Sequence, residues 1–189
     1  MSNGVVTTPV GRVSFPSVFT PYTNDQGKQV YEITLILDRD ADLSALKKIV
    51  AEAAAEKWGE DRSKWPNLKL PFNNGDDKAH KYPEYAGKIS IRATSKHQPG
   101  VVDAAVQPIM NQSDFYPGCF ARMRVNAFTF DNKQIGVSLG LNHIQKVKDG
   151  DPLGGGGARE RVEEAFEAIE ADDPDNYGEE AGADLDLGL

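Results

Sequence analysis

The chain has 189 residues, of which 39% are hydrophobic and 26% are charged, and its net charge is -8. Cys119 is the only cysteine, which excludes an intramolecular disulfide and a zinc site built from several thiolates. No apolar run approaches the roughly 18 residues of a membrane span, and the N-terminus has no signal-peptide pattern, so we expect a cytoplasmic protein without a membrane partner.

The charge is divided unevenly along the chain. Residues 151–189 contain 13 acidic and 2 basic residues, a net of -11, whereas residues 1–150 contain 16 acidic and 19 basic residues, a net of +3. Four consecutive glycines, residues 154–157, lie near this boundary and are typical of a hinge. We predict a folded domain over residues 1–153, followed by the hinge and a disordered acidic tail over residues 154–189.

The first predicted strand covers residues 9–22. Val13 and Phe15 alternate with Arg12 and Ser14, the period of two that is typical of a strand. Pro16 and Pro21 lack a backbone N–H and favour an edge strand or a bulged strand.

A turn, a strand and a helix are predicted next. The turn covers residues 24–27, and the β-branched and aromatic run at residues 30–37 predicts a strand. Asp42 is the expected N-cap of a helix that reaches Trp58 and ends at Gly59. The apolar face of this helix is expected to contain Leu43, Leu46, Ile49, Val50, Ala53, Ala54 and Trp58.

Residues 60–87 form a long excursion with little periodicity, and long loops in compact domains are usually functional. Within it, residues 74–77 have the sequence Asn-Gly-Asp-Asp. We favour a tight turn over a metal loop here, because no further carboxylate has a spacing that completes a site.

The second half of the chain predicts strands with period two. Residues 88–96 place Ile89, Ile91 and Ala93 on one face, with a polar face opposite, and residues 119–130 form a longer strand with a small, apolar face. Residues 134–141 predict one more strand, with a weaker extended piece up to residue 148. About five strands and one helix match a small OB-fold-like barrel, so the fold class is mainly β, with long loop excursions.

The polar faces of two predicted strands combine aromatic and basic side chains. Aromatic rings stack on bases and cations contact phosphates, which is what single-stranded DNA binding without sequence preference requires. The predicted DNA-binding residues on these strands are Lys88, Arg92, Lys96, Phe120, Arg122, Arg124, Phe128 and Phe130. The alternative for each residue is a solvated surface position or, for the last two phenylalanines, a second small core.

The excursion also interleaves basic and aromatic residues. We predict that Trp65, Lys78, Lys81 and Tyr82 contact the DNA strand as part of a clamp. For the aromatic residues, the alternative that they pin the loop onto the barrel stays open.

Motifs of known enzymes are missing from the sequence. There is no Walker A run, no nucleophile elbow and no paired-histidine metal motif. The three histidines, His80, His97 and His143, lie in separate segments without ligand-type neighbours at a useful spacing. We therefore expect a protein that is not an enzyme and uses neither a cofactor nor a metal.

The tail ends in acidic residues that alternate with leucines. A tip of this kind can dock in a basic pocket with an apolar floor on a partner protein. The residues expected to do so are Asp184, Leu185, Asp186, Leu187 and Leu189. The alternative is a tail that only increases solubility.

Several segments, in order, resemble a family of phage single-stranded DNA-binding proteins with an OB-fold. The likeness covers roughly residues 9–155 and is most specific over residues 85–103 and 116–150. The resemblance implies non-specific binding of single strands during phage DNA replication or recombination, in the cytoplasm of an infected bacterium. It also implies that the acidic tail competes with DNA and can recruit replication or recombination proteins, while self-association stays open.

Two other functions are compatible with the same sequence. One is a strand-annealing recombination mediator, and the other is a phage structural or adaptor protein whose barrel binds protein. A nuclease is the least favoured alternative, given the missing motifs.

Overall fold

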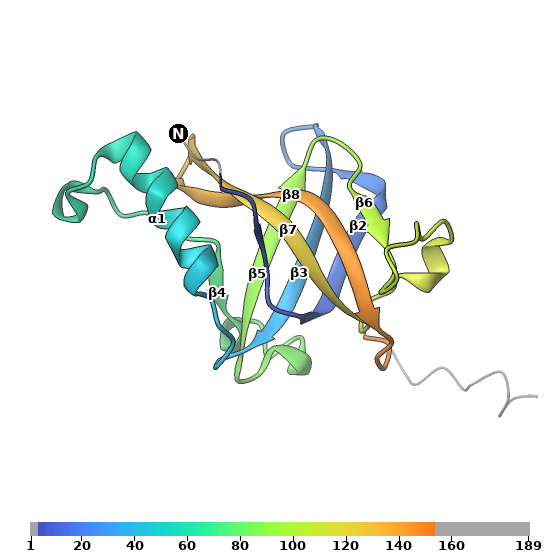
Figure 1. Ribbon diagram of the computed structural model, residues 1–189. Helices are drawn as coiled ribbons and strands as arrows, with labels where there is room; N and C mark the ends of the chain where they lie inside the picture. Colours follow the sequence, from blue (N-terminus) through green and yellow to red (C-terminus); the bar gives the residue numbers. More distant parts are fainter. Residues whose placement is uncertain (1–3, 154–189) are drawn as a thin grey trace, which may run out of the picture. The chain divides into compact units, whose positions relative to one another are not determined.

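The computed structural model describes residues 4–153, which form a mainly β structure with one α-helix (Figure 1). The predictions for the hinge, the tail and its tip lie outside these residues. The strands are β1 (Val6–Thr7), β2 (Gly11–Thr23), β3 (Gln29–Asp38), β4 (Phe72–Asn74), β5 (Lys88–Ser95), β6 (Gly100–Val102), β7 (Phe120–Asp131) and β8 (Ile135–Lys148). The α-helix is α1 (Ser44–Trp58), and short 3-10 turns lie at Arg62–Lys64, Gly75–Asp77, Pro83–Tyr85 and Gln112–Asp114.

Five strands close into a ring. β2 pairs with β3, β3 with β5, β7 with β8 and β7 with β2, all antiparallel, whereas β5 and β8 pair in parallel. The short strands β1, β4 and β6 pair with β7, β5 and β8 respectively. The predicted OB-fold-like five-stranded barrel with one helix is therefore confirmed.

The core fills the barrel with the apolar side chains of alternate strand residues. The inner face of β7 is Ala121, Met123, Val125 and Ala127, all buried, as its period of two predicts. β8 is one continuous strand, and its inner face shifts from Leu141 to Ile144 because the pairing with β7 changes register at that level.

Two strand residues depart from the simple alternation of buried apolar and exposed polar side chains. Phe15 is exposed because β2 has a bulge between Ser14 and Ser17, which turns its side chain outward. Ser90 lies on the outer face of β5 but is buried, since two 3-10 turns of the excursion, Gly75–Asp77 and Pro83–Tyr85, contact this strand. The expected bulge in β2 is itself confirmed.

The helix α1 covers one end of the barrel with its predicted apolar face. Leu46, Ile49, Val50 and Ala54 are buried against the barrel core. The predicted cap at Asp42 is wrong by one position, because Leu43 is the N-cap. The Asp42 side chain instead accepts a hydrogen bond from the backbone N–H of Ser44, at 3.0 Å.

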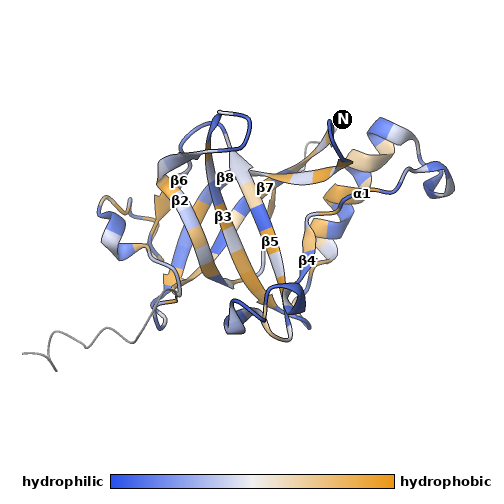
Figure 2. Cartoon of the chain, turned by 180° about the vertical axis from the view of Figure 1, so that it is seen from behind, coloured by the Kyte–Doolittle hydropathy of each residue, from blue (hydrophilic) through white to orange (hydrophobic). Residues whose placement is uncertain are grey.

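The excursion is a structured segment: Lys69 bridges to Gly136 of β8, β4 pairs with β5, and the part around Tyr82 and Tyr85 packs against β2. Tyr85 is fully buried there and donates a hydrogen bond from its hydroxyl to Ser14 Oγ, at 2.8 Å. Residues 74–77 form the predicted turn, with Asn74 Oδ1 accepting from the N–H of Asp76. In Figure 2 this segment is a hydrophilic loop at one end of β2, β3 and β5, and the turn between β2 and β3 lies at the other end.

The chain leaves β8 along a fixed path. The backbone N–H of Leu153 donates to the carbonyl of Pro117, at 2.8 Å, and the Arg12 guanidinium donates to the carbonyl of Asp151, at 2.6 Å. Tyr116 donates from its hydroxyl to Asp149. Within residues 4–153 no helix is both long enough and apolar enough to cross a membrane.

Candidate nucleic-acid interface

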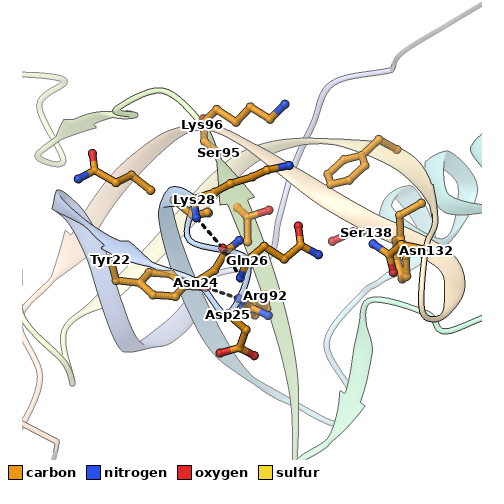
Figure 3. Close-up of a pocket in the computed structure, with 15 residues that line it drawn as sticks. Tyr22, Asn24, Asp25, Gln26, Lys28, Arg92, Ser95, Lys96, Asn132 and Ser138 are labelled. Atoms are coloured by element: carbon orange, nitrogen blue, oxygen red, sulfur yellow. Dashed lines mark hydrogen bonds between the residues drawn. The ribbon is translucent and has the colours of Figure 1, made fainter.

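A groove of about 1100 Å³ crosses the outer side of the barrel between two turns (Figure 3). Its first side comes from the turn between β2 and β3, within residues 22–30, and its other side from Phe128 and Phe130 of β7 with Asn132 of the following turn. Residues 92–96 of β5 and Ser138 of β8 lie between these sides. The groove therefore joins segments that are far apart in the sequence.

The outward residues of β8 in the middle of the groove are small, so they leave the groove open there. β8 lies between β5 and β7, with Gly140 opposite Thr94 and Ser138 opposite Phe128. A Cβ atom at residue 140 would lie 2.6 Å from Asn126 Oδ1, so a larger residue does not fit there without movement. The outward side chains of β5 and β7 consequently extend further than those of β8 between them.

The aromatic wall of the groove is accessible to solvent. The side chain of Phe128 is 41% exposed, whereas Phe130 is half-buried beside Gly136. An exposed aromatic ring costs free energy in water and offers a flat face on which a nucleobase can stack.

Arg92 is held in position by a small hydrogen-bonded network. Its guanidinium forms an ion pair with Glu32 and donates to the Tyr22 hydroxyl, at 2.8 Å. The Tyr22 hydroxyl donates in turn to Glu32 Oε2, at 3.0 Å. Burial and this bond to Glu32 raise the pKa of Tyr22, so the phenol stays protonated at neutral pH and keeps its hydrogen bond to Glu32.

Two lysines of the groove lining add positive charge and form no ion pair in the described part of the chain. Lys28 and Lys96 line the groove and are exposed, and neither forms an ion pair within residues 4–153. Asp25 is the acidic residue of the same lining. Because Arg92 is neutralised by Glu32, the two lysines supply most of the attraction for a phosphate backbone.

The turn between β2 and β3 is rigid. Asn24 Oδ1 accepts from the backbone N–H groups of Gln26 and Lys28, each at 3.0 Å. Gly27 has a φ of +73°, which other residues rarely adopt. Lys28 is thus presented at the groove by a preformed loop, as the predicted turn chemistry requires.

Four of the predicted DNA-binding residues meet in the groove: Arg92, Lys96, Phe128 and Phe130. Lys88 lies near the opposite end of β5, where it forms an ion pair with Asp38.

Arg122 and Arg124 line a second, smaller pocket of about 240 Å³, with Val106 and His143. Arg122 donates to Gln145 and Arg124 donates to Thr7. Phe120 is the first residue of β7, and the ammonium group of Lys148 lies 4.7 Å from its ring centroid.

The predicted residues of the excursion lie outside the groove as well. Trp65 packs partly against the core cluster near the end of α1, and its indole N–H donates to the carbonyl of Gly59, at 2.7 Å. Lys78, Lys81 and Tyr82 lie on the part that packs against β2, where the two lysines contact the rings of Tyr85 and Tyr82. Trp65 therefore holds the excursion against the barrel, which was the alternative to DNA contact for this residue.

The sequence analysis did not single out several residues of the groove. Tyr22 and Lys28 flank the predicted turn at residues 24–27. OB-folds bind nucleic acids partly through loops that join two strands, so residues beside a predicted turn are candidates for such a site. Gly136, Ser138 and Gly140 alternate with the inward residues of β8. Small outward residues at every second position indicate that the outer face of this strand carries no large side chains.

Comparison with known proteins agrees with this geometry. The family model described as "Enterobacter phage Enc34, ssDNA-binding protein" matches residues 3–177. The chain belongs to this family. The predicted resemblance is thus confirmed. Putative protein p50 of Acyrthosiphon pisum secondary endosymbiont phage 1 is 30% identical over 157 residues, covering 77% of this chain and 84% of that protein.

Two solved structures share the fold of this family member. The single-stranded DNA-binding protein from bacteriophage Enc34, in complex with ssDNA, has a TM-score of 0.66 and 24% identity, covering 80% of this chain and 90% of that one. Gp2.5, a single-stranded DNA-binding protein encoded by bacteriophage T7, has a TM-score of 0.59 and 16% identity, covering 88% and 99%. At these identities the likeness concerns the fold.

Proposed function

We propose that the chain is a single-stranded DNA-binding protein without sequence preference, and that the groove is its DNA site. The observation that carries the proposal is the exposed ring of Phe128 in the same groove as Lys28 and Lys96, two lysines that form no ion pair within residues 4–153. Membership of the Enc34 family supports it, since the family is described by that activity.

The expected mechanism combines stacking with phosphate contacts. Bases stack on Phe128 and Phe130, while Lys28 and Lys96, next to the paired Arg92, supply most of the attraction for the backbone. Every base has an aromatic face, so such a site tolerates any sequence. The protein acts stoichiometrically rather than as a catalyst, in phage DNA replication or recombination in the host cytoplasm.

The acidic tail is the proposed regulator. Its net charge of -11 over residues 151–189 opposes the +3 of the remaining chain, so it competes with DNA electrostatically and can recruit replication or recombination proteins. Deletion of residues 158–189 is expected to tighten DNA binding. Unchanged affinity of the truncated protein would argue against this competition.

Fluorescence anisotropy with labelled oligo-dT tests the DNA site directly. Phe128→Ala is expected to weaken binding by about fivefold or more, because stacking contributes about 1–3 kcal/mol per base. Phe128→Tyr keeps the ring and serves as the matched control. Duplex DNA of equal length should bind more weakly, and absence of any binding to oligo-dT in low salt would refute the function.

A further inference from the structure

Phe15 is held in an unfavourable backbone conformation while its ring is exposed. Its φ is +46°, a region that glycine and asparagine adopt far more readily, and its side chain is 46% exposed. The bulge of β2 between Ser14 and Ser17 produces this geometry. A strained residue that buries little apolar surface gains nothing for the core, and strain of this kind concentrates at functional sites.

The exposed ring is one side of an aromatic and basic cluster. Phe15 and Tyr82 are in edge-to-face contact, with ring centroids 5.1 Å apart, and Tyr82 lies 6.0 Å from Tyr85. The ammonium groups of Lys81 and Lys78 each lie 5.4 Å from a tyrosine ring centroid, on Tyr82 and Tyr85 respectively. Flat apolar faces and cations are therefore side by side.

The cluster is built on a fixed support. Tyr85 is fully buried and bonded to Ser14, next to Phe15 in the chain. The backbone N–H of Gly87 donates to Asp76 Oδ1, at 2.7 Å, and Asp76 also forms an ion pair with Arg39. These contacts hold the segment in place against β2.

The strand register places this cluster beside the groove. Ser14 is opposite Thr34 in β3, and Thr34 is opposite Arg92 in β5. Neighbouring strands lie about 4.8 Å apart, so the backbone next to Phe15 is roughly 10 Å from that of Arg92, a groove residue. A single strand that leaves the groove over β3 meets this cluster next.

We propose that Phe15 and Tyr82, with Lys78 and Lys81, form a second nucleobase-stacking site that extends the DNA path beyond the groove. The inference rests on the proposed DNA-binding function. Bases stack on the exposed ring of Phe15 and the lysines contact the adjoining phosphates, a combination that binds single strands of any sequence.

Phe15→Asn tests the site with little strain, because asparagine tolerates a positive φ. Val106→Asn is the matched control, since Val106 is the other non-glycine residue with positive φ within residues 4–153, at +62°, and lies in the pocket with Arg122 rather than near the groove. Dissociation constants are measured for oligo-dT from about 4 to 16 nucleotides, the range over which OB-folds bind.

The proposal predicts a dependence on length. Phe15→Asn should match the wild type for the shortest oligonucleotides and bind the longest about fivefold or more weakly. Val106→Asn should match the wild type at all lengths. Equal affinities of Phe15→Asn and wild type at every length, or an equal loss at every length, would overturn the second site while leaving the groove intact. If the wild type binds no oligonucleotide, the proposed function itself fails.

Discussion

The salt dependence of DNA binding follows from the charges of the groove. Each phosphate neutralised on a single strand contributes about -0.7 to the slope of log affinity against log salt. Lys28 and Lys96 are free of ion pairs in the described chain, whereas Glu32 already neutralises Arg92. For an oligo-dT of about 4 nucleotides, which fills the groove alone, we expect a slope near -1.4.

The double variant Lys28→Gln, Lys96→Gln removes both of these contacts. Affinity of the wild type should fall about sevenfold between 50 and 200 mM salt, whereas that of the double variant should change by about twofold or less. Fluorescence anisotropy titrations at four salt concentrations measure both slopes.

Lys88→Gln provides the matched control for the loss of charge. Lys88 is paired with Asp38 and lies outside the groove lining, so its replacement should leave the slope unchanged. A double variant that keeps the wild-type slope would refute the assignment of the phosphate contacts. An equal reduction by Lys88→Gln would show that net charge, rather than the groove, sets the salt dependence.

Three further predictions concern the groove, the excursion and the core. Ser138→Leu should weaken oligo-dT binding about tenfold or more by filling the groove, with the free energy of unfolding within about 1 kcal/mol of wild type. Oligo-dT binding as tight as that of the wild type would show that DNA does not occupy the groove. Tyr85→Phe leaves the buried Ser14 hydroxyl without its partner and should cost about 1–3 kcal/mol in denaturant unfolding, partly recovered by adding Ser14→Ala; no cost would show that water replaces the bond. Burial raises the pKa of the Cys119 thiol above its ordinary value of 9.0, so a thiol reagent should modify the folded protein far more slowly than the denatured protein, and stability should fall as the pH rises above that value; rapid labelling of the folded protein would show that this part of the barrel opens.

The strands were predictable from the sequence because side-chain alternation reports burial directly. The inner face of β7 emerges from its small and apolar odd residues, and the parallel pairing of β5 with β8 follows once five strands close into a ring. Phe15 breaks the pattern because a bulge changes the phase, and only proline nearby hints at it. Ser90 breaks it because its burial comes from a distant segment.

The site was predictable in kind but only partly in position. The outer face of β7 reads as one aromatic and basic stripe, yet the strand is 12 residues long and passes two different pockets. Phe128 and Phe130 reach the groove, whereas Arg122 and Arg124 face another part of the barrel. That division depends on the positions of the turns at residues 24–28 and 132–134 relative to β7. The alternation of residues within one β-strand gives no information about those positions.

Closure of the ring limits how neighbouring copies can meet. The strands outside the ring, β1, β4 and β6, have only two or three residues each. β2 pairs with β7 only at Gly11 and Arg12, and the rest of that edge is interrupted by a bulge and by Pro16 and Pro21, which lack a backbone N–H. A long open edge would invite strand addition between molecules crowded along one DNA strand, with aggregation as the outcome. For the part of the chain that the structure describes, we therefore expect copies bound side by side to meet mainly through side chains rather than by strand addition.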